Sequence, residues 1–583
     1  RPADLVGLVQ FSSEETVQAA INDARKWDAP PTERAAILNK AADLYEQNFG
    51  AFFALLAREA GKTQMDAIAE LREAVDFLRY YAARAIELDQ PARGIITCIS
   101  PWNFPLAIFT GQISAALAAG NGVLAKPAES TTLTGVFATQ LLHEAGVPVA
   151  ALQLLTGEGH DVGTWLTGSA KVDGVCFTGS TRTAQAINRN MAQNMSPTAP
   201  LIAETGGLNA MIVDSTALPE QAVRDIVASA FQSAGQRCSA LRVLYLQEDI
   251  ADPFLKMLFG AIDELVIGDP WHLRTDVGPL INQTAKKGIE AHVNPYGQAG
   301  RVLKHVRFPA EGHFVPTCVI QIDSIRDLKE EVFGPILHVV RYKSDDLDQV
   351  IADINATGFG LTFGIHTRID DRVTEVTNKV NVGNIYVNRN QIGAVVGSQP
   401  FGGEGLSGTG PKAGGPDYVK RFTDPGRVAL NGDLAAASQG SAQKTLDDID
   451  MPTTALTATA LPGPTGESNM LSVYGRGKVL CLGPGQAAAD DQANIARAAG
   501  CAAAILPDGI TPDALTALTG LDAVVSYADE ETLKSYRAAL AARDGKLIPL
   551  FAEKDLNERC RLERHICIDT TAAGGNASLL ASV

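Results

Sequence analysis

One of the eight cysteines of this chain lies in a setting that suits a nucleophile. Cys238 stands in the segment FQSAGQRCSA (231–240), after a turn of small residues and an arginine. The thiolate form of cysteine attacks carbon centres readily, whereas a free cysteine taken at random is usually an inert core residue. The chemistry that other segments could add to this sulfur decides between the two interpretations.

Two further side chains would complete a reaction at Cys238. Attack of its thiolate on an aldehyde carbon produces a tetrahedral oxyanion, which needs hydrogen-bond donors held in place. The amide of Asn103 in ISPWNFP and the backbone N–H of Cys238 are candidate donors. Loss of hydride leaves a thioester, whose hydrolysis needs a base beside water. Glu204 in LIAETGGLNA offers that carboxylate, and the glycines after it allow close approach of backbone and cofactor. Together the three predict oxidation of an aldehyde to an acid.

The hydride needs an acceptor bound near Cys238. The segment FTGSTRTAQAI (177–187) indicates a strand, a tight turn at Gly179 and Ser180, and then a helix. A helix start offers free N–H groups and the positive end of the helix dipole to a pyrophosphate. The segment lacks the GxGxxG pattern, so this signal is weak on its own.

Charged and aromatic residues of two other segments could hold the rest of a dinucleotide. Lys126 and Glu129 in LAKPAESTTLT (124–134) follow a strand and could bind ribose hydroxyls, although an ordinary solvent-exposed ion pair is an alternative. An acidic residue there would repel a 2′-phosphate, which favours NAD over NADP. Glu331 in KEEVFGPIL could hold the other ribose, with Phe333 packed beside the nicotinamide.

The elements that position these residues follow from the apolar pattern. Residues 14–88 show the spacing of several amphipathic helices. From residue 94, short apolar runs alternate with helical segments, namely GIITCIS, GNGVLAKP, LQLLTG and GVCFTGS. A second series within 206–390 contains AMIVD, RVLYLQ, HVVRY, FGIHT and GNIYVN. Strands that alternate with helices predict parallel sheets with crossover connections, and so an α/β fold.

The composition changes after residue 390. The Gly-rich segment 393–416 is too poor in apolar residues to form a core, so we predict a loop over the site. Residues 430–469, rich in Ala, Ser, Thr, Pro and Gly, are predicted to be a linker. Beyond them, a strand, glycine turn, helix and strand pattern restarts, and TTAAGGNASLLA (570–581) resembles ETGGLNAMIV (204–213), which hints at a degenerate duplication.

The overall composition excludes several classes of protein. With 583 residues, 46% of them hydrophobic, the chain can bury several cores. The net charge of −17, without a long Lys/Arg run, argues against a nucleic-acid partner. The scattered cysteines predict neither a disulfide framework nor a metal site, and they fit a cytoplasmic location. The apolar segment 106–125 contains polar residues and glycines, so no membrane span is expected. Because the first residue is Arg1, we expect a fragment of a longer protein.

Seven motifs in order resemble the aldehyde dehydrogenase superfamily, and they cover about residues 1–425: PWNFP (101–105), LAKPAE (124–129), FTGS (177–180), ETGG (204–207), GQRCS (235–239), EEVFGP (330–335) and PFGG (400–403). The resemblance implies a Rossmann-like NAD domain, an α/β catalytic domain and an oligomerisation flap. It implies that Cys238 is the nucleophile, Asn103 the oxyanion donor and Glu204 the general base. The NAD contacts that it implies are Trp102, Lys126, Glu129, Gly179, Ser180, Glu331 and Phe333.

Longer segments resemble the glutamate semialdehyde dehydrogenase module of bifunctional proline utilization A proteins, among them APLIAETGGLNAMIVDSTALPEQ and GAVVGSQPFGGEGLSGTGPKAGGP. That family implies an upstream FAD-dependent proline dehydrogenase, the oxidation of L-glutamate 5-semialdehyde to glutamate, and a non-catalytic aldehyde-dehydrogenase-like C-terminal domain. We also expect a homodimer. The expected domains are the N-terminal helices with the NAD domain (1–205), the catalytic domain (206–390), the substrate loop with the return to the NAD domain or flap (391–429), the linker (430–469) and the C-terminal domain (470–583).

This substrate carries a carboxylate and an ammonium, and a pocket that expels water must satisfy both. For the carboxylate, the candidates are the backbone N–H groups of Gly393 and Ala394, the hydroxyl of Ser239, and Arg237, which could instead favour the Cys238 thiolate. Glu70 could face the ammonium, and Phe104 and Phe401 could pack the aliphatic stem. A structural ion pair or a solvated helix surface explains Arg237 and Glu70 equally well. A different semialdehyde dehydrogenase and an inactive scaffold of the same fold are the alternative functions.

Overall fold

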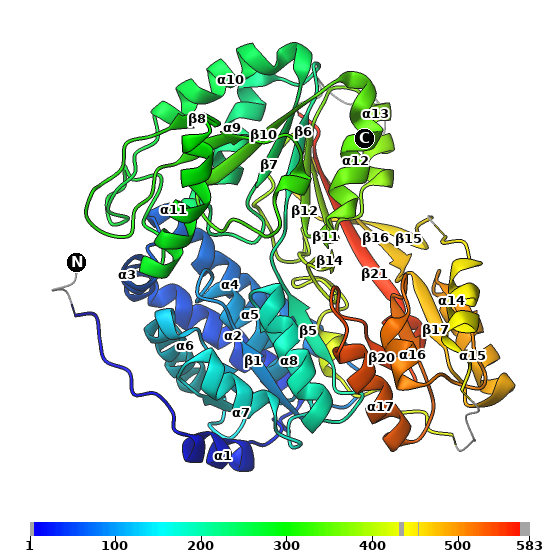
Figure 1. Cartoon of the computed structure of the whole chain (residues 1–583). Coiled ribbons are helices and arrows are strands. Elements are labelled where there is room, and N and C mark those ends of the chain that lie inside the picture. The colour runs from blue at the N-terminus through cyan, green and yellow to red at the C-terminus, as the bar shows by residue number, and fades with distance from the viewer. Residues whose placement is uncertain (1–4, 431–435, 453, 572–583) are drawn as a thin grey trace.

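The computed structural model describes residues 5–430, 436–452 and 454–571. Figure 1 shows two large α/β parts, one blue to cyan and one mainly green, and a smaller yellow-to-red part beside them. The last residues of the predicted duplication, 572–581, lie outside the described residues. Among the helices that are described, none combines the length and the apolarity that crossing a bilayer requires.

Four helices begin the chain, as the helical spacing of residues 14–88 predicts. They are α1 (Glu14–Asp23), α2 (Pro31–Gln47), α3 (Phe49–Glu59) and α4 (Gln64–Ala85). The α4 helix starts at an N-cap, Thr63, whose side chain accepts a hydrogen bond from the backbone N–H of Asp66. One face of α4 is buried along its length, including Leu71, Val75 and Leu78, and α4 packs against α2 and α5 (Ala107–Ala118). This packing fixes the acidic residues of α4 relative to the first sheet.

The first sheet is parallel and has the order β3-β2-β1-β4-β5. Its strands are β1 (Ile95–Ile99), β2 (Gly122–Lys126), β3 (Leu152–Leu154), β4 (Gly174–Thr178) and β5 (Leu201–Glu204). Its connections contain α5 (Ala107–Ala118), η1 (Glu129–Thr131), α6 (Thr132–Ala145), η2 (Gly159–Gly163), α7 (Thr164–Thr167) and α8 (Thr181–Asn194). The order reverses beside β1, so the loops after β1 and β4 border a crevice at the carboxyl ends of the strands.

The second sheet has ten strands in the order β15-β16-β21-β13-β12-β6-β7-β10-β9-β8. The strands predicted within 206–390 appear as β6 (Ala210–Val213), β7 (Val243–Gln247), β10 (Ile336–Tyr342), β12 (Thr362–His366) and β13 (Asn384–Val387). The short strands β8 (Val302–His305) and β9 (Cys318–Gln321) complete one edge. The helices of this part are α9 (Pro219–Phe231), η3 (Gln232–Gly235), α10 (Glu248–Asp263), α11 (Gln283–Gln298), η4 (Ile325–Asp327), η5 (Ser344–Asp346), α12 (Leu347–Ala356) and α13 (Asp370–Lys379).

The Gly-rich segment 393–416 is mainly irregular and lies between the two sheets. Its strand β14 (Glu404–Gly405) pairs with β11 (Phe359–Gly360). The chain then returns to the first part through η6 (Val419–Phe422), where Tyr418, Val419 and Phe422 are buried in the core formed by the N-terminal helices and the first sheet. The glycines therefore let one segment join both large parts.

The predicted linker contains regular structure over part of its length. Residues 430–469 contain α14 (Gln439–Asp447) and β15 (Thr457–Leu461), and β16 (Glu467–Gly475) begins before the expected boundary. Ala442 and Leu446 stand four residues apart on α14 and are fully buried in the C-terminal core. The low-complexity composition around them gave no sign of this apolar spacing. The side chains of Ser and Thr at the surface did not prevent an ordered helix and strand.

The described residues of the predicted C-terminal domain 470–583 form a sheet of their own and also join the second sheet. Its own parallel sheet has the order β18-β17-β19-β20, with β17 (Lys478–Cys481), β18 (Ala502–Ile505), β19 (Ala523–Val525) and β20 (Leu550–Phe551). Its helices are α15 (Gly485–Ala498), α16 (Pro512–Ala517), α17 (Glu530–Ala541) and α18 (Leu556–Arg559). The next strand, β21 (Arg561–Asp569), pairs in parallel with β13 and antiparallel with β16 (Figure 1). Residues from both ends of this segment therefore extend the second sheet.

Candidate active site

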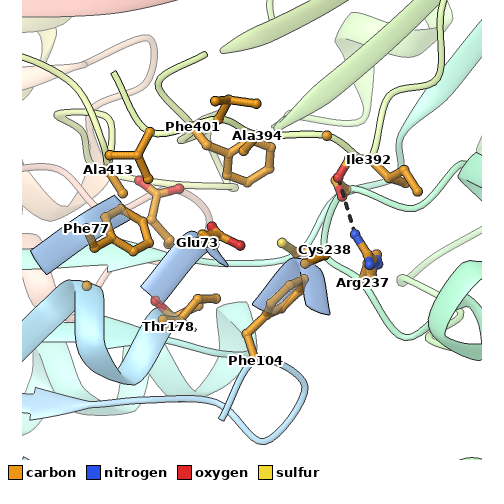
Figure 2. Close-up of a pocket in the computed structure, with 18 of the residues that line it drawn as sticks. Glu73, Phe77, Phe104, Thr178, Arg237, Cys238, Ile392, Ala394, Phe401 and Ala413 are labelled. Atoms are coloured by element: carbon orange, nitrogen blue, oxygen red, sulfur yellow. Dashed lines mark hydrogen bonds between the residues drawn. The ribbon is translucent and has the colours of Figure 1, made fainter. Parts of the chain in front are cut away.

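A cavity of about 460 Å³ lies where the two large parts meet the Gly-rich segment. Figure 2 shows Glu73, Phe104, Cys238 and Phe401 around this space. The residues predicted from the sequence that line it are Phe104, Glu204, Arg237, Cys238, Ser239, Gly393, Ala394 and Phe401. The fold thus brings together side chains that the chain separates by almost 300 positions.

A tight backbone turn presents Cys238 to the cavity. Ser233 and Ala234 have φ values of 54° and 55°, and Gly235 follows at 66°. A Cβ atom on Gly235 would lie 2.1 Å from the carbonyl oxygen of Gly334, so only glycine fits this contact. The buried guanidinium of Arg242 holds the turn by donating to the carbonyls of Gly235 (2.7 Å) and Arg237 (2.9 Å). Cys238 is partly exposed, whereas the other seven cysteines are buried.

The Cys238 thiol is held in its protonated form. Burial, and then the nearby carboxylates of Glu331, Glu204 and Glu73, raise the pKa of Cys238 to about 12. A thiol with this pKa is a poor nucleophile at neutral pH, because the thiolate is the reactive form. A base must therefore take its proton before or during attack.

Glu204, the base predicted from the sequence, lines the same cavity as Cys238. It ends β5, and its Oε2 atom accepts a hydrogen bond from the Gly403 N–H at 2.9 Å. Its Oε1 atom is buried and has no hydrogen-bond partner among the described residues. Burial raises the pKa of Glu204 to about 8. A Cβ atom on Gly402 or Gly408 would lie 2.9 Å from this carboxylate, so the glycines leave the room that Glu204 occupies.

Asn103 lies beside the cysteine loop. Its side chain is buried, and Nδ2 donates to the carbonyl of Gln236, two residues before Cys238, at 3.1 Å. An amide NH₂ group has two donors, and this bond uses one of them. The other is the donor that the predicted oxyanion role requires, and this role stays a prediction.

Arg237 faces the cavity but already has an acidic partner. Its Nη2 atom lies 3.1 Å from Asp66 Oδ1, and its guanidinium lies over the ring of Phe104, 5.4 Å from the centroid. Its Nη1 atom donates to the Ile392 carbonyl at 3.4 Å (Figure 2). Because Asp66 offsets its charge and the pKa of Cys238 is nonetheless raised, the geometry does not favour the alternative in which Arg237 stabilises the thiolate.

Glu70 is not a wall of the cavity, contrary to the prediction. Its carboxylate is buried, lies 3.2 Å from Lys62 Nζ, and accepts hydrogen bonds from the backbone N–H groups of Leu106 (2.9 Å) and Ala107 (3.3 Å). These are the N–H groups that begin α5, where a carboxylate stabilises the helix. Glu70 therefore supports the position of the loop that carries Asn103.

Glu73, three residues further along α4, is a cavity residue that sequence reasoning missed, and Arg72 and Asp76 of the same helix line the cavity as well. Burial and the neighbouring Glu70 raise the pKa of Glu73 to about 7. In Figure 2 its carboxylate faces the same space as the Cys238 sulfur. The helical spacing of Asp66, Glu70 and Glu73 was the available signal, because residues three or four apart share a helix face. Spacing alone does not show which of the three reaches the cavity.

The candidate cofactor residues follow the strand ends of the first sheet. Ser180 is the N-cap of α8 and accepts from the Thr183 N–H, and no acidic residue stands in the first helical turn. The N–H of Gly179 donates to the Glu204 carbonyl at 3.1 Å, which joins this turn to β5. The Lys126 ammonium is buried and lies 3.7 Å from the half-exposed carboxylate of Glu129. Burial lowers the pKa of Lys126.

The remaining cofactor candidates form a cluster with Arg242. Its Nη2 atom pairs with Glu331 at 2.8 Å, and its guanidinium lies 5.2 Å from the centre of the Phe333 ring. Trp102 meets Phe333 edge to face, with 5.6 Å between the ring centroids. A Cβ atom on Gly206 would lie 1.8 Å from the carboxylate of Glu331. The first glycine of the ETGG motif therefore leaves the room that this carboxylate occupies.

Known proteins match most of this chain. A model described as the aldehyde dehydrogenase family matches residues 2–428. The chain is 46% identical to the Bifunctional protein PutA of Escherichia coli, over 99% of this chain and 49% of that protein. It is 36% identical to the 1-pyrroline-5-carboxylate dehydrogenase of Bacillus cereus, over 71% of this chain and 86% of that protein. The chain thus spans about half the length of the PutA proteins that it matches.

Solved structures show the same relationship. A variant of proline utilization A from Bradyrhizobium japonicum matches with a TM-score of 0.69 and 51% identity, over 71% of this chain and 45% of that chain. A variant of the 1-pyrroline-5-carboxylate dehydrogenase from Thermus thermophilus matches with a TM-score of 0.67 and 32% identity, over 71% of this chain and 85% of that chain.

Proposed function

Because this chain belongs to the aldehyde dehydrogenase family, we propose that it oxidises L-glutamate 5-semialdehyde to L-glutamate with NAD⁺, the second step of proline catabolism. The observation that carries the proposal is a single cavity lined by a thiol, a basic carboxylate and a second carboxylate, namely Cys238, Glu204 and Glu73. The first two supply the chemistry of aldehyde oxidation, and the third suits a substrate with an ammonium group.

The chain's own residues account for the proton transfers and the covalent step. Glu204 accepts a proton through its free Oε1 atom as the Cys238 sulfur bonds to the aldehyde carbon. The second N–H of Asn103 and the backbone N–H of Cys238 stabilise the oxyanion. After hydride loss the substrate is held as a thioester on Cys238. Glu204 gives up the proton to solvent and, as a carboxylate again, takes a proton from a water molecule. This water adds to the acyl carbon, the carbon–sulfur bond breaks, and glutamate and the Cys238 thiol are released.

The residues at the strand ends fit a dinucleotide. The N-terminus of α8 carries a neutral cap, Ser180, and offers N–H groups to a pyrophosphate. Lys126 and Glu129 suit the hydroxyls of one ribose, Glu331 suits those of the other, and Trp102 and Phe333 form an apolar wall for the nicotinamide. When bound, NAD⁺ supplies the hydride acceptor. The carboxylate of Glu129 supports NAD over NADP, because it would repel a 2′-phosphate.

The far end of the cavity suits the charged end of the substrate. The backbone of Gly393 and Ala394 and the side chain of Ser239 lie on its wall and can donate to the substrate carboxylate. Glu73 is the proposed partner of the ammonium, in place of Glu70. Phe104 and Phe401 also lie on the cavity wall, where they can pack the aliphatic stem (Figure 2).

A pair of substrates tests the role of Glu73. Succinate semialdehyde has the aldehyde and the carboxylate but no ammonium. We expect Glu73→Gln to raise KM for glutamate semialdehyde about tenfold, because the ammonium loses its ionic partner, and to leave KM for succinate semialdehyde within about twofold. Steady-state NADH absorbance measures both. Equal effects on the two substrates would contradict the proposed substrate, and a wild-type preference for succinate semialdehyde would favour a different semialdehyde dehydrogenase.

The partners that we propose rest on the resemblance to the proline utilization A family alone. The proline utilization A family implies an FAD-dependent proline dehydrogenase in the same polypeptide as the source of the semialdehyde, and we propose this partner together with a homodimer and a cytoplasmic location. The 46% identity to bifunctional PutA proteins supports it. Cross-linking of the purified full-length protein measures the homodimer.

A further inference from the structure

A second cavity, of about 30 Å³, lies where the first part meets the C-terminal part. Its walls come from α8, the segment that leads into β5, α17 and the segment that leads into β20. Figure 1 shows α8 and α17 next to each other, and the two helices are in contact. This cavity shares no lining residue with the candidate active site.

Three arginines line this cavity, and two of them have no polar partner for the side chain. Arg537 of α17 is only 7% exposed, and within the described ranges its guanidinium makes no hydrogen bond or ion pair. The guanidinium of Arg421 lies over the Phe551 ring, 5.9 Å from its centroid, and its Nη1 atom also has no partner there. Arg476 donates to three backbone carbonyls, including that of Thr409 at 3.1 Å, and makes no ion pair with a carboxylate among the residues that the structure describes.

The acidic residues nearby do not balance these charges. Glu553 is the acidic residue on the cavity wall, and its Oε1 atom lies 3.2 Å from Arg93 and 3.9 Å from Arg559. Two further guanidiniums therefore already share the one carboxylate. Burial without a compensating charge lowers the pKa of Arg537 to about 10. A buried, unpaired guanidinium is costly unless a counter-ion joins it.

We propose that this cavity binds a small oxyanion of the phosphate class between Arg537, Arg421 and Arg476. Guanidinium groups bind such oxygens through parallel N–H donors, which matches the free donors on Arg537 and Arg421. The side chains of Asn188 and Thr198 on the same wall add neutral donors. A cavity of about 30 Å³ exceeds the space that one water molecule needs and is far too small for a nucleotide.

An anion in this position would join the C-terminal part to the strand that ends in Glu204. Thr409 Oγ1 accepts from the Ala203 N–H at 2.9 Å and donates to the Leu201 carbonyl at 3.0 Å, both within β5. Arg476 holds the Thr409 carbonyl from the other side. The ligand would thus add to the stability of the whole chain by binding the folded state alone.

Thermal unfolding with inorganic phosphate tests the proposal. In the presence of NAD⁺, about 20 mM phosphate is expected to raise the Tm of the wild-type protein about 2 °C above that in sodium chloride of equal ionic strength. Arg537→Met is expected to remove this increment. Arg189→Met is the matched control, since Arg189 lies on α8 at the same junction but is 45% exposed and pairs with Asp544 outside the cavity. It is expected to keep the full increment.

Two comparisons keep the test decisive. Arg537→Lys retains the charge without the forked donors and is expected to keep a reduced increment, which covers the case in which Arg537→Met does not fold. A phosphomonoester, glycerol 3-phosphate, separates the sources of the ligand: protection by inorganic phosphate alone identifies the free ion, and protection by both identifies a phosphorylated metabolite. Equal Tm values in phosphate and chloride, or an undiminished increment in Arg537→Met, would overturn the site.

Discussion

The first sheet and the sheet of the C-terminal part have related topologies but differ in what stands at the ends of their strands. Without its edge strand β3, the first sheet has the spatial order β2-β1-β4-β5, and the C-terminal sheet has the order β18-β17-β19-β20. In both, the second strand of the chain lies on one side of the first and the later strands lie on the other. Both are parallel throughout.

The helices that follow equivalent strands of the two sheets differ in the charge at their N-termini. The helix after β4, α8, is capped by the neutral Ser180 and has no acidic residue in its first turn. The helix after β19, α17, is capped by Asp529, and Glu530 and Glu531 follow at once. Carboxylates stabilise a helix N-terminus, but they also occupy the N–H groups and repel a pyrophosphate. The start of α17 is therefore less suited to a pyrophosphate than the start of α8.

The two sheets also differ in the polarity of a residue at a strand end. In the first sheet Lys126 ends β2 opposite Ile99, whereas in the C-terminal sheet the matching position beside β17 is Ile505, opposite Cys481. An apolar side chain cannot bind a ribose hydroxyl. The comparison teaches that function in this molecule depends on a few polar residues placed on a fold that both parts share.

The largest expected effect is the loss of the nucleophile. Cys238→Ala should lower NADH formation by at least about 10⁴-fold, because no other group can form the thioester, and NAD⁺ should still bind. Stopped-flow absorbance measures the first and calorimetric titration the second. Cys481→Ala in the C-terminal sheet is the control and should leave kcat within about twofold. Unchanged turnover in Cys238→Ala would favour an inactive scaffold.

Removal of the base should have the next largest effect. Glu204→Gln is expected to lower steady-state kcat about 10²- to 10³-fold, since the thioester would no longer be hydrolysed efficiently. The Glu204 carboxylate with a pKa of about 8 is ionised increasingly as pH rises through that value, so wild-type kcat should increase from pH 6.5 to 8.5. The variant should lack this rise. A variant with the same pH profile as the wild type would assign the base to another group.

The smallest effect tests the helix starts directly. Ser180→Asp gives α8 the acidic cap of α17, and we expect KM for NAD⁺ to increase about tenfold because the carboxylate opposes the pyrophosphate. Asp529→Ser makes the reverse change in α17 and should not alter KM for NAD⁺. Steady-state kinetics at varied NAD⁺ measures both. An unchanged KM in Ser180→Asp would place the pyrophosphate elsewhere.

Much of the candidate site could be predicted from short continuous motifs. Cys238, Glu204 and Phe401 each stand in a motif that combines a reactive or apolar side chain with glycines, and the fold places all three on one cavity. The choice between Glu70 and Glu73 could not be made in this way. Both share one helix face, and only the packing of α4 against α5 directs the first to the start of α5 and the second to the cavity.

Pairing between distant segments was also beyond local patterns. The composition of residues 430–469 did not indicate the strands β15 and β16. The sequence near residue 565 likewise does not indicate that its strand pairs with the strand that begins at residue 384. Strand pairing depends on surfaces that exist only in the folded molecule, so local periodicity predicts that a strand forms but not where it goes.

The pairing of β13 with β21 also constrains how the molecule can assemble during synthesis. Asn384 and His565 are register partners about 180 residues apart. Until the ribosome has released β21, the free side of β13 offers unpaired N–H and C=O groups that another copy can bind. Such a late, long-range closure slows folding and exposes an edge that favours aggregation.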